Sequence, residues 1–235
     1  VFCKLGLDPS VIGGLVDGEL HDFYFYPLDG AKIDPIFSDS KTGLDLIRHS
    51  AAHILAEAVQ SIYPDTKVTI GPVIDDGFYY DFFTEKTFTE ADLALFEEKM
   101  HEIIKKKVSF IPSTLTRNDA LKTFSDINEK FKIEIINDLP EEEDITIYKQ
   151  GSWFDLCRGP HAPNSSFIKS FKLLSVAGSY WRGDENRESL QRIYGTAFFN
   201  KKDLKKHLEM IEEAKKRDHR KLGKELNLFS ITDEI

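Results

Sequence analysis

The chain has 235 residues, 41% hydrophobic and 30% charged, and its formal net charge of −9 argues against a surface uniformly coated for nucleic acid. That size suits one large or two small domains. The sequence has neither the ~20-residue apolar run of a membrane span nor a segment that resembles a signal peptide. Two cysteines are too few for a disulfide framework, so the expected location is a reducing cytoplasm.

The first forty residues predict a small β unit. Residues 13–20 read as a strand pair around an Asp17-Gly18 turn, and residues 23–26 as a short aromatic strand that ends at Pro27. No apolar set here is large enough for an independent core, so the unit is a partial or appended module. Residues 38–43 are polar and predict a linker that caps the next helix.

An amphipathic helix is predicted next, and it carries two histidines. Their spacing of four places His49 and His53 one turn apart, nearly opposite a narrow apolar stripe, so that both rings can point at one target. On its own, such a pair is better explained by two surface histidines on a solvated face, and the second Cys/His pair described below weakens that interpretation. The apolar stripe consists of Leu44, Ile47, Ala51, Ile54, Leu55, Ala58, Val59 and Ile62.

The middle of the chain alternates between strand and helix patterns. Residues 67–70 alternate as a strand, and residues 73–82 predict a hairpin that turns at Asp76-Gly77 and places Phe78, Tyr80 and Phe82 on one face. Thr89-x-x-Asp92 is typical of a capping box before a helix. The buried stripe of that helix is Leu93, Phe96, Met100, Ile103 and Ile104.

A short helix and two strands follow. Asn118 is expected to cap a helix that runs through Phe124, and residues 131–135 alternate as a strand on which Lys132 faces outward. Residues 141–144 are acidic and predict a solvated loop, and residues 145–148 predict another strand.

The second chemically distinctive segment is Cys157-Arg158-Gly159-Pro160-His161. Its glycine and proline predict a turn, which could aim Cys157 and His161 toward His49 and His53. Further strands are predicted at residues 167–176 and 190–199, followed by a long helix from Lys201.

That C-terminal helix is predicted to be amphipathic and basic. Residues 201–224 hold ten Lys or Arg against five acids, a local charge of +5 that suits either contact with nucleic-acid phosphates or a charged solvated face. Its apolar side is Leu204, Leu208, Ile211 and Leu222.

The Cys/His quartet is compatible with three kinds of chemistry. Three imidazoles and a thiolate can bind zinc tetrahedrally. Without a metal, the same groups can hold a polar substrate and a water for hydrolysis. Cys157 beside a histidine could also be a nucleophile, although no oxyanion-hole motif is visible. The spacing alone does not choose among them.

Five segments together resemble bacterial-type threonyl-tRNA synthetase, over essentially the whole chain. They are residues 48–53, 70–81, 155–161, 177–184 and 190–197. By this resemblance, residues 1–38 are part of a β-grasp TGS domain whose beginning is missing, and residues 39–200 are an α+β editing domain with an antiparallel sheet and packed helices. Residues 201–235 are the linker helix toward an absent aminoacylation core, to which ATP and zinc belong. The resemblance thus implies a fragment or a naturally truncated form.

The resemblance also implies an activity, which is hydrolysis of the seryl ester of mischarged threonine tRNA with the threonyl ester spared. His49 and Lys132 would position or activate the attacking water, while His53, Cys157 and His161 shape the pocket. Asp155 would bind the seryl ammonium or orient a histidine. The residues implied to bind the rest of the substrate are Tyr80, Gly71 and Arg158, and Arg182 is a further candidate for phosphate contact.

Partners and cofactors follow from the same resemblance. The expected partners are the 3′ end of threonine tRNA and the rest of the synthetase, in a full-length homodimer. No metal is expected in the editing domain, but the quartet also resembles the zinc-binding editing domain of alanyl-tRNA synthetases. Two alternatives therefore remain, a zinc-dependent hydrolase of another ester or amide and a non-catalytic tRNA-binding module.

Overall fold

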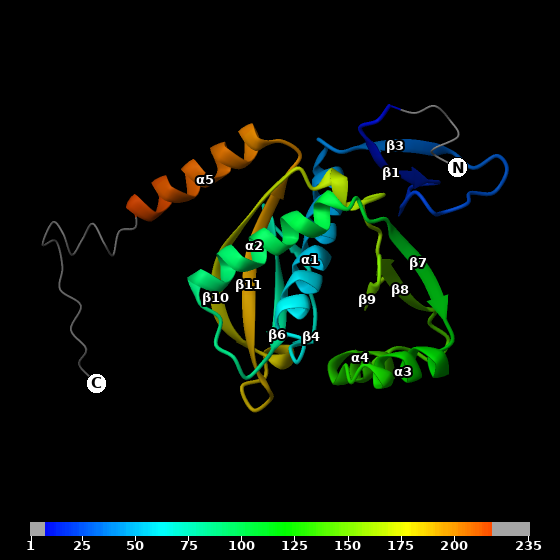
Figure 1. The fold of residues 1–235 in the computed structure, drawn as a ribbon. Coiled ribbons are helices and arrows are strands. Elements are labelled where there is room, and N and C mark those ends of the chain that lie inside the picture. Colours follow the sequence, from blue (N-terminus) through cyan, green and yellow to red (C-terminus); the bar gives the residue numbers. More distant parts are fainter. Residues whose placement is uncertain (1–7, 218–235) are drawn as a thin grey trace, which may run out of the picture.

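The computed structural model describes residues 8–217, in which helices and antiparallel sheets are mixed (Figure 1). Strands pair antiparallel in all three sheets of this part of the chain, which confirms the α+β class. No helix within residues 8–217 is long and apolar enough to cross a membrane. Cys3 and the predicted helix beyond residue 217, including Leu222, lie outside the described residues.

Helix α1 (Lys41–Ile62) runs through the middle of the molecule, with the largest sheet on one side and a second sheet on the other (Figure 1). Ser40 caps it as predicted, because its side chain accepts from the Gly43 N–H at 3.0 Å. The expectation of a narrow apolar stripe is wrong, since α1 is buried on nearly all sides between two layers. Small residues allow this close packing, and the four fully buried alanines are Ala51, Ala52, Ala56 and Ala58.

The largest sheet has the strand order β10-β11-β6-β4, with β5 also paired to β6. Phe78, Tyr80 and Phe82 of β6 are buried in the core that includes α1, as the alternation predicts. The strands are β4 (Lys67–Val68), β5 (Val73–Ile74), β6 (Gly77–Phe83), β10 (Ser170–Tyr180) and β11 (Ser189–Phe198).

The hairpin of β5 and β6 turns one residue earlier than predicted. Ile74 pairs with Gly77, so the turn residues are Asp75 and Asp76, and Asp76 takes the positive φ of 56°. Gly77 serves another purpose, because a Cβ there would overlap the carbonyl oxygen of Gly195 on β11.

Helix α2 (Glu90–Lys105) packs on α1 and on β10. Its predicted capping box is present, with the Thr89 side chain accepting from the Asp92 N–H and the Asp92 side chain accepting from the Thr89 N–H. Four of the five residues of the predicted stripe are buried and Ile104 is half-buried.

A second sheet, with the order β7-β8-β9, lies across α1 from the first and carries helices α3 and α4 (Figure 1). The cap of α3 is Thr116, which accepts from the Asp119 N–H, so the assignment of Asn118 as the cap is wrong. The elements are β7 (Phe110–Leu115), α3 (Arg117–Asp126), α4 (Lys130–Asp138), β8 (Ile145–Gln150) and β9 (Trp153–Leu156).

The predicted strand at residues 131–135 is wrong, because this segment begins helix α4. Phe131 and Ile135, four residues apart, pack beside Trp181, while Ile133 and Ile136, three apart, pack in the cluster of α3 and β8. A helix placed between two apolar clusters thus shows apolar residues at alternate positions, which imitates a strand over five residues. Lys132 is consequently not an outward-facing strand residue, and it is 2% exposed.

The N-terminal sheet has the order β2-β1-β3 and turns at Asp17-Gly18 as predicted. Ile12 and Ile36 join it to the core of α1. Its strands are β1 (Val11–Val16), β2 (Glu19–His21) and β3 (Ile33–Phe37).

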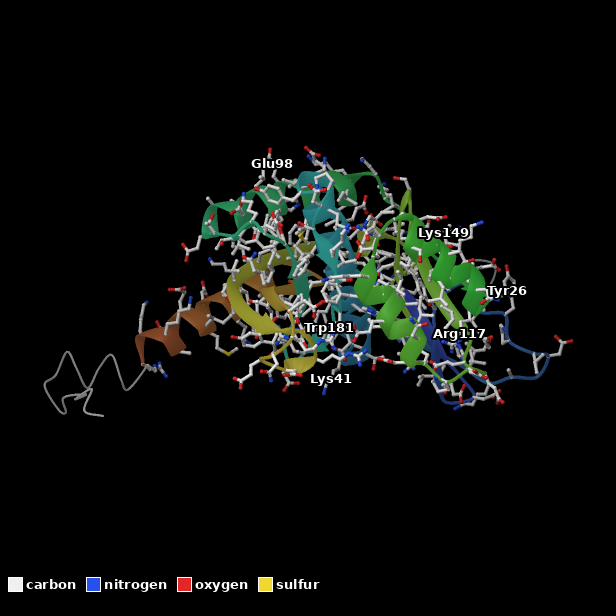
Figure 2. All side chains as sticks on the ribbon, turned by 90° about the horizontal axis from the view of Figure 1, so that it is seen from below. Tyr26, Lys41, Glu98, Arg117, Lys149 and Trp181 are labelled. Atoms are coloured by element: carbon white, nitrogen blue, oxygen red, sulfur yellow. The ribbon has the colours of Figure 1, made fainter. Side chains whose placement is uncertain are left out.

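The predicted aromatic strand at residues 23–26 does not form. Asp22 bends the chain instead, since its Oδ1 accepts from the Tyr24 N–H at 2.9 Å and its carbonyl accepts from the Phe25 N–H. Tyr26 lies at the periphery of the molecule, 78% exposed (Figure 2).

The chain leaves the largest sheet through α5 (Lys201–Lys216), of which no residue is buried. Leu204, Leu208 and Ile211 are half-buried along one side, in agreement with the predicted apolar side. Strands β10 and β11 match the predicted strands approximately, although residues 165–167 form a short 3-10 helix (Ser165–Phe167) and a second one (Trp181–Gly183) follows β10.

We expect Leu55→Ala to lower the free energy of unfolding by about 2–5 kcal/mol, because Leu55 is fully buried in α1 and its removal leaves a cavity. The matched control is Leu95→Ala on α2, where the side chain is 42% exposed and the change should be within about 0.5 kcal/mol. Urea unfolding measures both, and equal losses would contradict the central position of α1.

Candidate active site

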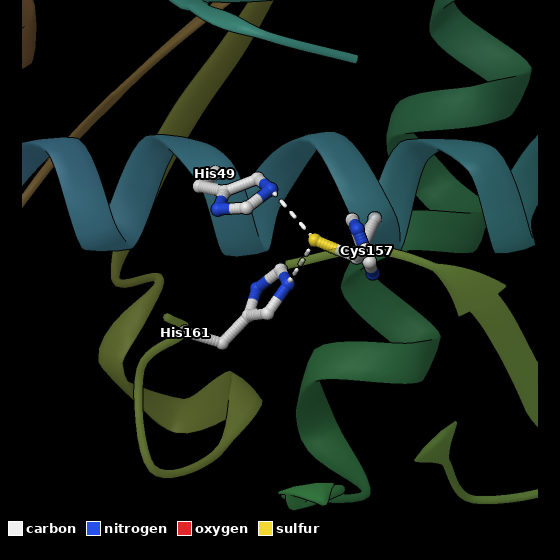
Figure 3. A group of neighbouring side chains, drawn as sticks. His49, Cys157 and His161 are labelled. Carbon is white, nitrogen blue, oxygen red and sulfur yellow. Dashed lines mark hydrogen bonds between the residues drawn. The ribbon is translucent and has the colours of Figure 1, made fainter. Parts of the chain in front are cut away.

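Four potentially reactive side chains meet between α1 and the turn after β9. His49 and His53 come from α1, and Cys157 and His161 from the turn, and their ligand atoms lie within 4.8 Å of one another. Cys157 Sγ is 3.2 Å from His49 Nε2 and 3.4 Å from His161 Nε2 (Figure 3). The predicted approach of the turn to the helix is therefore confirmed.

Two backbone groups of the turn fix these contacts. The Gly159 N–H donates to Cys157 Sγ at 3.2 Å, and Gly159 has a φ of +70°, which favours glycine. The Pro160 carbonyl lies 3.2 Å from His49 Nδ1. Because a carbonyl only accepts, His49 Nδ1 carries its proton, and Nε2 presents a lone pair toward the thiol.

Ser50 is a site residue that the sequence analysis missed. Its hydroxyl donates to the Leu46 carbonyl (2.8 Å), accepts from the Ala162 N–H (2.9 Å) and lies 3.2 Å from His161 Nδ1. The single hydroxyl proton of Ser50 is donated to the Leu46 carbonyl, so Ser50 can only accept from His161. The Nδ1–H of His161 therefore donates to Ser50, and its Nε2 keeps its lone pair. The only signal in the sequence is the position of Ser50 beside His49 on the same helix.

The neutral forms of these groups are favoured by burial. Burial raises the pKa of the Cys157 thiol to about 12, and it lowers the pKa values of His53 and His161 well below 6.5. Burial also lowers the pKa of His49, although the Pro160 carbonyl opposes that shift. A protonated thiol is a poor nucleophile, and its single proton can serve only one of two facing imidazoles. The other imidazole keeps a lone pair, which is the requirement for a general base.

A buried ion pair lies beside the quartet. Lys132 Nζ is 2.6 Å from Asp155 Oδ1, and it donates to the Thr69 carbonyl at 2.7 Å and to Tyr80 Oη at 3.2 Å. The Tyr80 hydroxyl donates to the other carboxylate oxygen of Asp155 at 2.5 Å. Burial, followed by the charge of Asp155, raises the pKa of Tyr80 well above its usual value, so it remains a neutral donor. Such pairing offsets the cost of burying a lysine that is only 2% exposed.

Three members of the quartet, His49, His53 and Cys157, and the ion pair line one cavity of about 550 Å³. His161 is excluded from its lining and lies fully buried behind Cys157. Gly71 lines the cavity where a Cβ would overlap the Tyr80 ring. The other predicted site residues in the lining are His49, His53, Tyr80, Lys132, Asp155, Cys157 and Arg158.

The two arginines considered for phosphate contact lie in different places. Arg158 is at the cavity, with its side chain 76% exposed and 2.5 Å from the Glu143 carboxylate. Arg182 follows β10 and pairs with Glu134 and Asp138 of α4, and it does not line the cavity.

The donor set of the quartet fits zinc chemically, since three imidazoles and one thiol suit a tetrahedral ion. The geometry fits less well. The His49 and His161 rings are stacked, with centroids 4.1 Å apart and planes 27° apart. Within residues 8–217, Nδ1 of buried His53 has no hydrogen-bond partner, whereas zinc-bound histidines usually donate through their second nitrogen.

Residues 145–194 match the family described as threonyl and alanyl tRNA synthetase second additional domain. The chain is 52% identical over 219 residues to the threonine–tRNA ligase of Wolbachia pipientis subsp. Culex pipiens, covering 93% of this chain and 35% of that protein. It is 51% identical to the threonine–tRNA ligases of Legionella pneumophila subsp. pneumophila (228 residues; 97% and 36%) and Citrifermentans bemidjiense (230 residues; 98% and 36%). The chain is homologous to part of the threonine–tRNA ligases.

It spans about a third of the length of these ligases. The matched domain contains Asp155, Cys157 and His161. The two histidines of α1 and Lys132 lie outside that domain match, and the fold brings them to it.

We expect Ser50→Ala to destabilise the protein by about 1–3 kcal/mol, because the buried Ala162 N–H loses its acceptor and His161 Nδ1 loses its partner. Ser61→Ala on the same helix is the control, since Ser61 is exposed and donates only to the Ala58 carbonyl. Chemical unfolding gives both values, and ¹⁵N shifts of His161 report its tautomer. Equal effects of the two substitutions would refute a special position for Ser50.

Stability should fall as the pH is lowered from 7 to 5. His49, His53 and His161 have folded pKa values below their unfolded value, so below about pH 6.5 the unfolded state binds more protons. Glu129 opposes this, because burial raises its pKa to about 7 and its contribution is lost as the pH rises from about 4.5 to 7. Glu57, whose pKa burial also raises, acts in the same direction as Glu129. The histidines outnumber these two acids, and we expect a net loss of about 1–3 kcal/mol.

Glu129→Gln should steepen that loss, because it removes the carboxyl group whose protonation in the folded state opposes the effect of the histidines. Urea unfolding at pH 7, 6 and 5 compares the variant with the wild type. A shallower dependence in the variant would show that the assigned direction for Glu129 is wrong.

Proposed function

We propose that this chain hydrolyses the ester between serine and the 3′-terminal adenosine of threonine tRNA and spares the threonyl ester. The observation that carries the proposal is one cavity that holds a neutral imidazole and a buried ammonium on adjacent walls, in a homologue of the threonine–tRNA ligases. Hydrolysis of an ester needs a base for water and a positive group for the developing oxyanion. The cavity offers both.

His49 acts on the attacking water in this proposal. Its Nδ1 proton is held by the Pro160 carbonyl, so its Nε2 is the acceptor. When the Cys157 proton points to His161, Nε2 of His49 takes a proton from water as the water oxygen bonds to the ester carbon. The bond to the ribose oxygen then breaks, and that oxygen takes the proton back from His49 Nε2, which releases serine and tRNA and restores the neutral imidazole.

Lys132 supplies the positive charge, held in place by Asp155 and the Thr69 carbonyl. It orients the water or stabilises the oxyanion, where a fixed ammonium in a buried site acts more strongly than in water. Asp155 has its oxygens on Lys132 and Tyr80, and it attracts the seryl ammonium to the same end of the cavity. Tyr80 and Gly71 line the part that receives the adenosine.

Discrimination against threonine is steric in this proposal. One methyl group is worth only about 1–3 kcal/mol in a binding pocket, so a ligation site confuses serine with threonine and a second site that excludes the larger product is useful. His53, Cys157 and the buried His161 form the wall that the methyl group meets. Because Ser50 and Gly159 hold this wall, it cannot recede easily.

Phosphate contact is assigned to Arg158, Arg182 and the exposed basic residues of α5, which give affinity without reading sequence. The other proposed partner is the remainder of a threonine–tRNA ligase, homodimeric and cytoplasmic. No metal is assigned to the quartet. The stacked rings support this choice, while the zinc-compatible donor set makes a zinc-dependent hydrolase the second candidate.

Deacylation of seryl- and threonyl-tRNA by this chain, with and without a chelator, tests the proposal. We expect preferential loss of serine that a chelator does not affect. His49→Ala should lower kcat by about 100-fold or more, because it removes the base. His101→Ala is the control, since His101 is an exposed histidine on α2 outside the candidate site.

Four results would contradict this scheme. Equal hydrolysis of the two esters, or full activity after His49→Ala, would refute it. Loss of activity on chelation would favour the zinc hydrolase, and tRNA binding without turnover would favour a binding module.

A further inference from the structure

A hydrogen bond links the N-terminal sheet to the strand that supports the candidate site. Asp22 directly follows β2, and its Oδ1 accepts from the Tyr24 N–H at 2.9 Å. Its Oδ2 accepts from the Tyr148 hydroxyl of β8 at 2.6 Å. Asp22 is 7% exposed and Tyr148 4%, so this is a buried hydrogen bond between two separate sheets.

Tyr148 in turn supports the turn that carries Cys157 and His161. Its ring centroid lies 4.5 Å from that of His161. The ring and hydroxyl of Tyr148 also fill the space beside Gly159, where a Cβ would overlap them. Since the Gly159 N–H donates to Cys157 Sγ, a shift of the Tyr148 ring would reach both site residues of the turn.

We propose that Asp22 and Tyr148 are a positioning pair through which the N-terminal sheet fixes the geometry of this turn. A carboxylate that accepts from a phenol makes a strong, directional hydrogen bond at low dielectric. The Asp22 carboxylate is itself oriented by the Tyr24 N–H. It therefore fixes the Tyr148 hydroxyl, and the Tyr148 ring in turn restricts Gly159. Neither residue touches the cavity, and both act through the turn.

The apolar packing of the N-terminal sheet on α1 does not replace this hydrogen bond. Ile12 and Ile36 pack with Leu46 in the common core, which attaches the sheet to α1. Apolar packing stabilises this attachment but has little directionality, and it is applied to α1 rather than to the turn. Tyr148–Asp22 is therefore the contact that transmits the position of the sheet to Cys157.

The reactivity of Cys157 tests the pair without relying on any activity. In a Cys3→Ser background, iodoacetamide modifies only Cys157, whose Sγ is held by Gly159 and two histidines. We expect Asp22→Ala and Tyr148→Phe each to raise the rate about tenfold, which corresponds to about 1.4 kcal/mol. The double variant should be no faster than either single variant, because both remove one bond.

Two further variants separate positioning from general loosening. Asp22→Asn keeps hydrogen-bonding groups toward Tyr24 and Tyr148, so its rate should be close to that of the wild type. Asp17→Ala removes a carboxylate that accepts from the Lys32 N–H in the same sheet but does not contact Tyr148, and it should leave the rate unchanged. Tyr148→Phe keeps the ring and the core volume, so it remains informative if Asp22→Ala fails to fold.

Unchanged Cys157 rates in Asp22→Ala and Tyr148→Phe would overturn the proposal, as would an equal rise in Asp17→Ala. The consequence for catalysis rests on the proposed function, and there we expect kcat for seryl-tRNA hydrolysis to fall with KM unchanged in both variants. If the two variants show the expected rise in Cys157 modification but the wild-type chain does not hydrolyse seryl-tRNA, the proposed function fails and the positioning pair stands.

Discussion

The burial of α1 on nearly all its sides is the constraint on which the rest of the structure depends. One helix contributes the alanines that let two sheets approach and also two of the four clustered side chains. Residues with so little freedom are held in single rotamers by their neighbours, which is how a protein keeps reactive groups aligned before a substrate arrives. It also means that the core and the site cannot be altered independently.

The polar groups around α1 are arranged to limit the cost of burying them. Lys132 and Asp155 would each be strongly unfavourable alone, and they are paired with each other and with Tyr80 and the Thr69 carbonyl. The quartet avoids the same cost in another way, because burial keeps its members neutral. A neutral imidazole cluster beside a fixed cation is a suitable environment for moving one proton from water. It is less suitable for a thiolate.

Much of this arrangement could be predicted where a short-range rule determines the structure. The capping residues Ser40 and Thr89 and the Asp17-Gly18 turn depend on neighbours within a few positions, and all three are present. The meeting of the Cys157–His161 turn with α1 was anticipated from residue types alone. Its angle could not be, because that depends on Ser50 and on the contact between Tyr148 and Asp22 across 126 positions.

Two of the failures involve tertiary contacts that overrode a local pattern. Residues 131–135 alternate because α4 packs between two apolar clusters, and the same packing buries Lys132. Residues 23–26 have strand propensity but bend at Asp22, whose carboxylate is bound to Tyr24 and Tyr148. Nothing within a ten-residue window reveals the two apolar clusters around α4 or the contact of Asp22 with Tyr148.

The contact between Gly71 and Tyr80 has a consequence for how the cavity measures a substrate. Where a flexible side chain forms a pocket wall, rotamer exchange gives that pocket a range of widths. Here the wall is backbone at Gly71, pressed against a ring whose hydroxyl is bound to Asp155 and Lys132. This part of the cavity therefore has one width, and a ligand group that lies against it must fit without displacing backbone.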